Sequence, residues 1–205
     1  GDDVWHISSG EQGDYSKFAI MKGDRQVADV EWPLVGRHNA LNALAALLAA
    51  RHAGVPIETG VAALKAFAGV RRRLEKCGVV GGVTVYDDFA HHPTAIEQTI
   101  DALRRRVGAA RLIAVLEPRS NTMKLGTHRH ALAASLAAAD AVFVYQGPSV
   151  QWNVSEAVAP LGARAHVATD LEALVETLAR TARSGDHVLI MSNGSFGGIH
   201  EKLLA

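Results

Sequence analysis

Beyond residue 69 the sequence alternates short apolar, β-branched runs with amphipathic segments of helical period. The apolar runs predict strands at 83–87, 111–116, 141–145, 163–168 and 187–192. The amphipathic segments predict helices at 94–106, 127–138, 170–182 and 198–204. Strands separated by helices of this length are typical of βαβ units. The pattern therefore predicts an α/β fold built on a mainly parallel sheet.

The first part of the chain has a different pattern. Turn residues separate three short strands, predicted at 4–8, 18–22 and 26–32. Two helices are then predicted, at 38–53 and 57–66. Leucines and alanines cover most of the first helix, so we expect it to be largely buried. Three such strands make a poor core alone, and we expect their sheet to continue upstream.

The pattern changes near residue 68, which divides the chain into 1–68 and 69–205. The sequence begins at Gly1 without an initiator Met and runs directly into an expected strand. We therefore expect the chain to be a fragment of a longer protein.

The bulk composition narrows the classes of function. The chain has 205 residues, 48% of them hydrophobic, which suffices for a sizeable core. Its 21 basic and 21 acidic residues cancel, which argues against nucleic-acid or anionic-membrane partners. The single cysteine, Cys77, fits a reducing compartment. No apolar run approaches the ~20 residues of a membrane span, and no leader is evident, so we expect a cytoplasmic protein.

Polar residues follow four of the predicted strands. They are Asp87-Asp88, the segment 117–122, Gln146 and the segment 192–195. Ligands of open parallel sheets bind outside the carboxyl ends of the strands. Four polar endings therefore predict a binding site at this edge, although loops are polar in general.

Two further motifs suit a nucleotide. Asn39 and Asn42 are three residues apart at the start of a helix, and amides can pair with a purine edge. The alternative is an N-cap and a satisfied core amide. The three arginines at 71–73 suit phosphate oxygens, because guanidinium groups bind them bidentately. The alternative is a solvated basic turn.

The segment Val85-Tyr86-Asp87-Asp88-Phe89-Ala90-His91-His92-Pro93 allows several interpretations. One aspartate could accept hydrogen bonds from both ribose hydroxyls. A rival interpretation is a metal-dependent hydrolase or phosphoesterase that uses Asp87, Asp88, His91 and His92, with His128 and His130 as further ligands. The spacing matches no familiar metal motif, so we assign no metal ligand. The simplest alternative is that Asp88 or His92 only caps the next helix.

Two later segments suit an anionic substrate. Arg119 and Lys124 are natural partners for carboxylates. The glycine-rich segment 191–200 joins a strand to a helix, where backbone N–H groups can hold an anion. These 205 residues contain no Gly-x-x-x-x-Gly-Lys-[Ser/Thr] motif, so a P-loop for nucleotide phosphates is absent from them.

Taken in order, three motifs resemble the Mur ligases of peptidoglycan synthesis: GRHNALNALAA, GVRRRLE and VYDDFAHHP. EPRSNTMKLG and MSNGSFGGIH further resemble a member of that family that acts in murein recycling. The resemblance implies that 1–68 is the end of a central P-loop ATPase domain. It implies that 69–205 is a Rossmann-like C-terminal domain. The whole enzyme would join UDP-N-acetylmuramate to the tripeptide L-alanyl-γ-D-glutamyl-meso-diaminopimelate.

The resemblance also implies roles for individual residues. It places Asn39 and Asn42 at the adenine, with His38 nearby, and Asp88 at the ribose. It places Arg73, the one catalytic residue we assign, at the nucleotide phosphates, with Arg72 beside it. The residues implied to bind the incoming peptide are Arg119, Ser120, Asn121, Thr122, Lys124, Ser192, Asn193, Gly194 and Ser195.

The chemistry implied by the resemblance is ATP-dependent amide formation. ATP phosphorylates the muramoyl carboxylate, Mg²⁺ balances the phosphate charge, and the amine of the peptide attacks the acyl phosphate. Such enzymes need a P-loop and closure of their domains on the nucleotide. We therefore expect this chain alone to be inactive.

Overall fold

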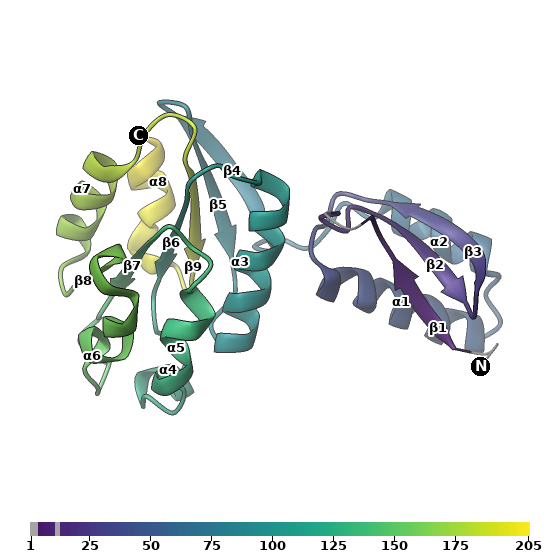
Figure 1. Cartoon of the computed structure of the whole chain (residues 1–205), viewed down its shortest axis with the longest axis horizontal. Coiled ribbons are helices and arrows are strands. Elements are labelled where there is room, and N and C mark those ends of the chain that lie inside the picture. The colour runs from purple at the N-terminus through teal and green to yellow at the C-terminus, as the bar shows by residue number, and fades with distance from the viewer. Residues whose placement is uncertain (1–3, 11–12) are drawn as a thin grey trace. The chain divides into compact units, whose positions relative to one another are not determined.

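The computed structural model describes residues 4–10 and 13–205. The chain forms two compact units, Gly1–Arg71 and Arg72–Ala205, and each is described here by itself (Figure 1). The break follows the expected position near residue 68 by three residues. Among the described residues, no helix is both long and apolar enough to span a membrane.

The first unit packs two helices against a small antiparallel sheet. Its strands β1 (Trp5–Ser8), β2 (Lys17–Lys22) and β3 (Arg25–Glu31) lie in the order β1-β2-β3. The helices are α1 (Arg37–His52) and α2 (Ile57–Ala66). All five predicted elements are confirmed, with small shifts at their ends. The three strands stay together because alternate side chains of β2 and β3 share a core with α1.

The expectation that α1 is largely buried is wrong. Its buried side chains are those of Ala40, Ala43, Leu44 and Leu47, which follow the three- and four-residue spacing of one helix face. Leu41 lies off this stripe and is 38% exposed. Only one face of α1 packs on the described sheet, so the apolar composition of the helix overstates its burial.

The second unit is built on a six-stranded sheet in the order β4-β5-β9-β6-β7-β8. Its strands are β4 (Glu75–Val80), β5 (Val83–Asp88), β6 (Leu112–Leu116), β7 (Ala141–Tyr145), β8 (Ala165–Ala168) and β9 (His187–Met191). Its helices are α3 (Pro93–Val107), α4 (Asn121–Lys124), α5 (Arg129–Leu136), α6 (Val154–Val158), α7 (Leu171–Thr181) and α8 (Ile199–Leu204). All paired strands run parallel except β4, which pairs antiparallel with β5. The predicted α/β class and mainly parallel sheet are confirmed.

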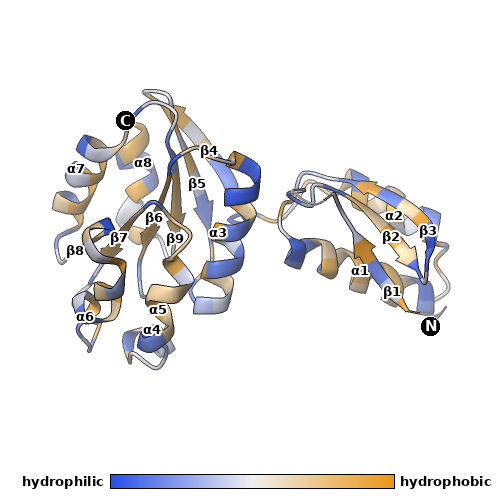
Figure 2. Cartoon of the chain, in the orientation of Figure 1, coloured by the Kyte–Doolittle hydropathy of each residue, from blue (hydrophilic) through white to orange (hydrophobic). Residues whose placement is uncertain are grey.

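Both faces of this sheet are buried. In β6, Leu112, Ala114 and Leu116 pack in the core under α3, α5 and α6. Ile113 and Val115 pack in the opposite core, under α7 and α8. Strands covered on both faces are apolar throughout, as Figure 2 shows for β6, β7 and β9. The helices on the two faces thus hold the central strands, and with them the loops at their ends.

The differences from the predicted elements are local. Sequence patterning missed β4, because its residues are half polar and it pairs along one side only. It also missed α4 and α6, which are only four and five residues long. The helix expected at 127–138 is the shorter α5, and the strand expected at 163–168 starts at Ala165, after a 3₁₀ turn at Ala159–Arg164.

Removing the side-chain cap of α7 should lower the stability of the second unit. Asp170 is the N-cap, and its Oδ1 accepts a hydrogen bond of 2.8 Å from the Ala173 N–H. Asp170→Ala should reduce the free energy of unfolding by about 1 kcal/mol, as measured by denaturant titration. Glu176→Gln, on the exposed surface of the same helix, is the matched control. Equal effects of the two substitutions would contradict the capping role.

Candidate functional site

The carboxyl ends of the parallel strands meet at one edge of the second unit, where the sequence predicts a site. Strand β9 lies between β5 and β6. The chain leaves β5 and β6 toward α3 and α5 on one face, and leaves β9 toward α8 on the other. Loops that diverge in this way open a crevice at the strand between them. Polar side chains from all three strand ends gather there.

Asp88 ends β5 and is buried, with 3% of its surface exposed. Its carboxylate accepts hydrogen bonds from the Leu74 N–H at 2.8 Å and the Ala90 N–H at 2.7 Å. The Thr99 hydroxyl of α3 adds a third bond at 3.3 Å. Burial raises the pKa of Asp88 above its usual value despite these donors. The carboxylate therefore ties the Leu74 turn, β5 and α3 together.

Asp87, in β5, forms an ion pair with Arg72, in the turn before β4. The Nε of Arg72 lies 2.8 Å from Oδ2 of Asp87, and the Nε2 of His200 lies 3.2 Å from Oδ1. Burial by itself would raise the pKa of Asp87, but the nearby His200 and Arg72 side chains outweigh it and lower the pKa. Outside the rival metal site, the sequence suggests no role for Asp87. The structure gives it one, as the partner of Arg72.

The turn that carries Arg72 and Arg73 has an unusual backbone. Arg72 and Leu74 have φ values of 59° and 50°, which non-glycine residues seldom adopt. This backbone conformation costs free energy and persists where surrounding contacts fix it. Here Leu74 donates a hydrogen bond to Asp88, and Arg72 donates one to Asp87. The exposed Arg73 side chain lies over the Phe89 ring, with Cζ 6.0 Å from the ring centroid. Its guanidinium is thus available to a ligand beside β5.

The loops after β6 and β9 are joined by Glu117 and Ser192. The Ser192 hydroxyl donates to Oε2 of Glu117 at 2.5 Å and accepts from the Gly194 N–H at 2.9 Å. The other Glu117 oxygen lies 3.7 Å from Arg119. A Cβ on Gly194 would stand 2.4 Å from the Arg119 Nε, so the arginine side chain lies against the Gly194 backbone. Arg119 is thereby held at the edge of the sheet, half exposed.

The remaining residues expected at the peptide lie around Arg119. The segment from Asn121 to Lys124 forms helix α4, although its polar sequence after β6 suggests a loop. Ser120 is its N-cap, and Asn121 and Thr122 are exposed on its first turn. In the other loop Ser195 is exposed, whereas Ser192 is fully buried and both functions of its hydroxyl are used. Asn193 has a buried Oδ1 that finds no hydrogen-bond partner among the residues described.

The rival metal site is not formed. Within the described part of the chain, no three His, Cys, Asp or Glu side chains are placed to hold a metal ion. His91 contacts the Phe89 carbonyl through Nδ1 at 2.9 Å, and the His92 ring packs on His128, 4.2 Å between centroids. The exposed His130 joins neither contact. His92 does precede Pro93 at the start of α3, but its side chain makes no capping bond.

In the first unit, the predicted asparagines lie at the start of α1. The Asn39 side chain donates to the Val35 carbonyl at 2.7 Å, so this amide is partly satisfied within the unit. Neither asparagine is the N-cap, which is Gly36 with φ 94°. Asn42 is exposed one turn later, and His38 is half-buried. Asn42 thus offers its amide to solvent from the exposed face of α1.

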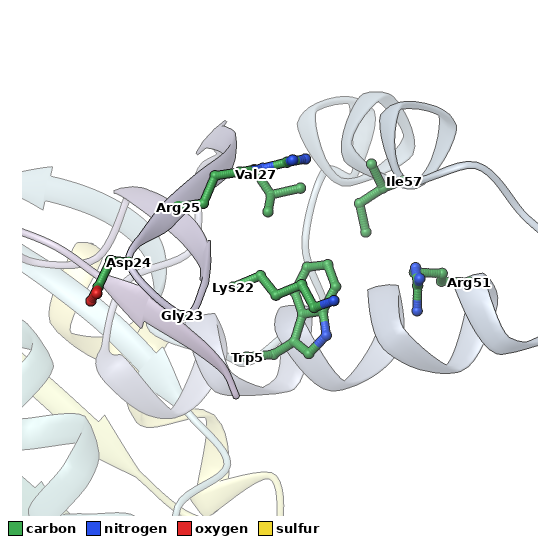
Figure 3. A pocket seen from close by; sticks show the side chains of 8 residues that line it. All are labelled: Trp5, Lys22, Gly23, Asp24, Arg25, Val27, Arg51 and Ile57. Atoms are coloured by element: carbon green, nitrogen blue, oxygen red, sulfur yellow. The ribbon is translucent and has the colours of Figure 1, made fainter. Parts of the chain in front are cut away.

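The first unit also has a pocket of about 570 Å³ that none of the sequence motifs reaches. Trp5 lies at its centre, and Arg51 stacks on the ring with Cζ 5.5 Å from the centroid. Lys22 and Arg25 lie on the same side, whereas the Asp24 side chain points away (Figure 3). Arg51 is at the C-terminal end of α1, ~20 Å along the helix from Asn39. The pocket is therefore separate from the asparagines.

Comparison of the sequence with known protein families identifies the family of this chain. Residues 72–194 match the family described as "Mur ligase, glutamate ligase domain". The chain belongs to the Mur ligase family. The resemblance read from the motifs is thereby confirmed, and the α/β unit that carries Arg73, Asp88 and Arg119 is the part that matches.

Three relatives of this Mur ligase chain are informative. It is 50% identical over 205 residues to the UDP-N-acetylmuramate--L-alanyl-gamma-D-glutamyl-meso-2,6-diaminoheptandioate ligase of Escherichia coli K12, covering 95% of this chain and 45% of that protein. A crystal structure of a murein peptide ligase from Psychrobacter arcticus is 39% identical, with a TM-score of 0.73, over 98% of this chain and 43% of that one. A domain from Haemophilus ducreyi, described as from such a tripeptide ligase, is 55% identical with a TM-score of 0.56, over 64% and 97%. The chain thus spans less than half of the E. coli enzyme.

Acid should weaken the contribution of Asp87 to stability. Its pKa is lowered in the folded protein, so the ion pair with Arg72 stabilises above the unfolded pKa of ~3.9 and is lost as the pH falls through the folded value. Asp87→Asn should cost about 1–3 kcal/mol of unfolding free energy at pH 7 and much less near pH 2. Denaturant titrations across this range measure the difference. A constant difference at all pH values would contradict the assignment.

Proposed function

We propose that this chain forms part of an ATP-dependent ligase that joins UDP-N-acetylmuramate to L-alanyl-γ-D-glutamyl-meso-diaminopimelate. The observation that carries the proposal is 50% identity, across 95% of the chain, with an E. coli protein named for that reaction. The site is compatible with this reaction: the exposed Arg73 guanidinium lies beside the buried Asp88 carboxylate, and the Arg119 guanidinium follows β6, with β9 between the two strands.

The reaction we propose proceeds through an acyl phosphate. ATP phosphorylates the muramoyl carboxylate, and the peptide amine displaces the phosphate. Mg²⁺, held mainly by phosphate oxygens of the nucleotide and by water, would balance the phosphate charge. This chain contributes binding and orientation of the reactants.

For the nucleotide, we assign the adenine to Asn39 and Asn42, with His38 nearby. Arg73 approaches the phosphates, supported by its exposure at the β5 edge. We assign Asp88 to the ribose as well. Its carboxylate already accepts three bonds, so we expect its larger contribution to be indirect. By holding the Leu74 N–H, it fixes the position of the adjacent Arg73.

For the peptide, we assign the carboxylates to Arg119 and Lys124. The tripeptide carries several carboxylates, and partly exposed guanidinium and ammonium groups beside the strand ends are suited to them. Five neighbours complete the proposed peptide contacts: Ser120, Asn121, Thr122, Asn193 and Ser195. Gly194 allows Arg119 to pack on its backbone, and the buried Ser192 orders the loop.

The assay that tests this function measures phosphate release from ATP with UDP-N-acetylmuramate and the tripeptide. The full-length ligase, with its upstream residues, should release phosphate only when all substrates are present. The 205-residue chain alone should release none, because it contains no P-loop. Ligase turnover by the chain alone would contradict the proposal that the reaction needs a P-loop outside these 205 residues.

Gly194→Ala should impair the peptide specifically. The new methyl group would overlap Arg119 at its Nε, so the side chain must leave its place beside Glu117. We expect the KM for the tripeptide to rise about tenfold, the loss of one charge-assisted contact, with little change in the KM for ATP. Gly10→Ala, at a glycine of the first unit that has open space around it and no positive φ, is the control for glycine replacement. An unchanged tripeptide KM would contradict the role of Arg119.

A further inference from the structure

Arg72 lies between the ends of β5 and β9 and contacts both of them. Its guanidinium is bound on one side by Asp87, with Nε–Oδ2 at 2.8 Å and Nη2–Oδ1 at 3.4 Å. On the other side, Nη2 donates to the Ser192 carbonyl at 2.7 Å. Its Cζ stacks over the Phe89 ring at 5.2 Å. The side chain thus joins the end of β5 to the end of β9.

The backbone of Arg72 belongs to the turn that presents Arg73. Its N–H donates to Oε2 of Glu75 at 2.7 Å, and its carbonyl accepts from the Phe89 N–H at 2.9 Å. A residue with a φ of 59° needs such contacts to persist. The side-chain contacts of Arg72 with Asp87 and Ser192 add to these backbone bonds in holding the turn that places Arg73.

From Ser192 the contacts continue to the peptide residues. The Ser192 hydroxyl binds Glu117, and Glu117 in turn faces Arg119. The Ser192 N–H also donates to the Asp88 carbonyl at 3.1 Å. A continuous series of direct contacts thus runs from the Arg73 turn, through Arg72 and Ser192, to Arg119.

We propose that Arg72 is a positioning residue that sets the nucleotide-facing and peptide-facing loops together. Asp87 orients it, and His200 supports Asp87 from α8. This assigns Arg72 a different task from Arg73, although the sequence places them side by side. Two of its three donor nitrogens are already directed at protein oxygens, so a phosphate would have to compete with Asp87 for it. The inference rests on the proposed function.

Kinetics of the full-length ligase test the proposal with Arg72→Gln and Arg72→Lys. We expect both variants to raise the KM for ATP and the KM for the tripeptide, each about five- to tenfold, with a smaller change in kcat. Lysine should not rescue, because its single ammonium cannot span Asp87 and Ser192. Arg105→Gln, which removes an exposed pair with Asp101 in the same unit, should leave both KM values unchanged.

Two outcomes would overturn the proposal. A rise in the KM for ATP alone would make Arg72 a direct phosphate ligand. A loss of kcat with both KM values unchanged would make it a general stabilising residue. The amide NMR signals of Gly194 and Ser195 in the 205-residue chain provide a readout that does not depend on the reaction. They should shift in Arg72→Gln and stay in place in Arg105→Gln, even if the proposed substrates were wrong.

Discussion

Replacing Arg73 by alanine in the full-length ligase is expected to lower kcat/KM for ATP about 100-fold, or roughly 2.7 kcal/mol of transition-state stabilisation. The Arg73 side chain is exposed, and the turn that carries it is fixed by Asp88. A preorganised guanidinium stabilises the negative charge of a phosphoryl group during its transfer. Arg73→Lys should recover only part of the loss, because lysine cannot bind bidentately.

The control for this prediction is Arg105→Ala, which removes an arginine from the outer surface of α3. It should leave kcat/KM for ATP unchanged. The fold should be intact in both variants, since the Arg73 side chain is exposed and its replacement removes only a partly exposed contact with the Phe89 ring. An Arg73→Ala enzyme of full activity would remove Arg73 from the nucleotide site.

Asp88→Ala is expected to lower the stability of the second unit by about 3 kcal/mol. The substitution leaves the Leu74 and Ala90 N–H groups and the Thr99 hydroxyl without their acceptor in a buried place. Removal of a buried carboxylate also removes its desolvation cost, which the raised pKa reflects, so the net loss is smaller than three full hydrogen bonds. Asp88→Asn keeps one acceptor oxygen and should cost less.

Hydrogen exchange of the β9 amides measures this stability without interference from the first unit. The amides of Leu189 and Ile190 lie at the centre of the second unit and exchange only when it opens. Asp101→Ala, on the exposed surface of α3, should change the free energy of opening derived from these exchange rates by less than about 0.5 kcal/mol. If Asp88→Ala exchanged no faster than this control, Asp88 would not be holding the turn.

The sequence predicted the sheet because its strands are apolar on both faces. The runs at β6, β7 and β9 carry no polar residue that would suggest another environment, apart from His187 at the start of β9. The polar strand endings could be predicted for the same reason, since parallel strands end at one edge. Burial of α1 was overestimated, because apolar composition does not say how many of its faces meet another element.

The contacts within the site could not be predicted from the sequence. Asp87 and Asp88 are adjacent and chemically alike, yet one pairs with Arg72 and the other with backbone N–H groups. Their alternation across β5 explains the difference, but most of their partners lie on other elements: the turn before β4, α3 and α8. Ser192 and Arg72 are 120 residues apart, and only the insertion of β9 beside β5 brings them together. Strand β4 pairs antiparallel with β5 and brings Glu75 opposite Asp87, which places the preceding turn with Arg72 near Asp87. A prediction of β4 could therefore have suggested the Asp87–Arg72 ion pair, but sequence patterning missed this strand.

The most direct test of the proposed function compares amine acceptors in the full-length ligase. With ATP and UDP-N-acetylmuramate, the rate of coupling should be high for L-alanyl-γ-D-glutamyl-meso-diaminopimelate and low for L-alanine. Arg119→Ala should reduce coupling of the tripeptide through a raised KM. Coupling of L-alanine alone, with the tripeptide inert, would contradict the proposed substrate and the role of Arg119.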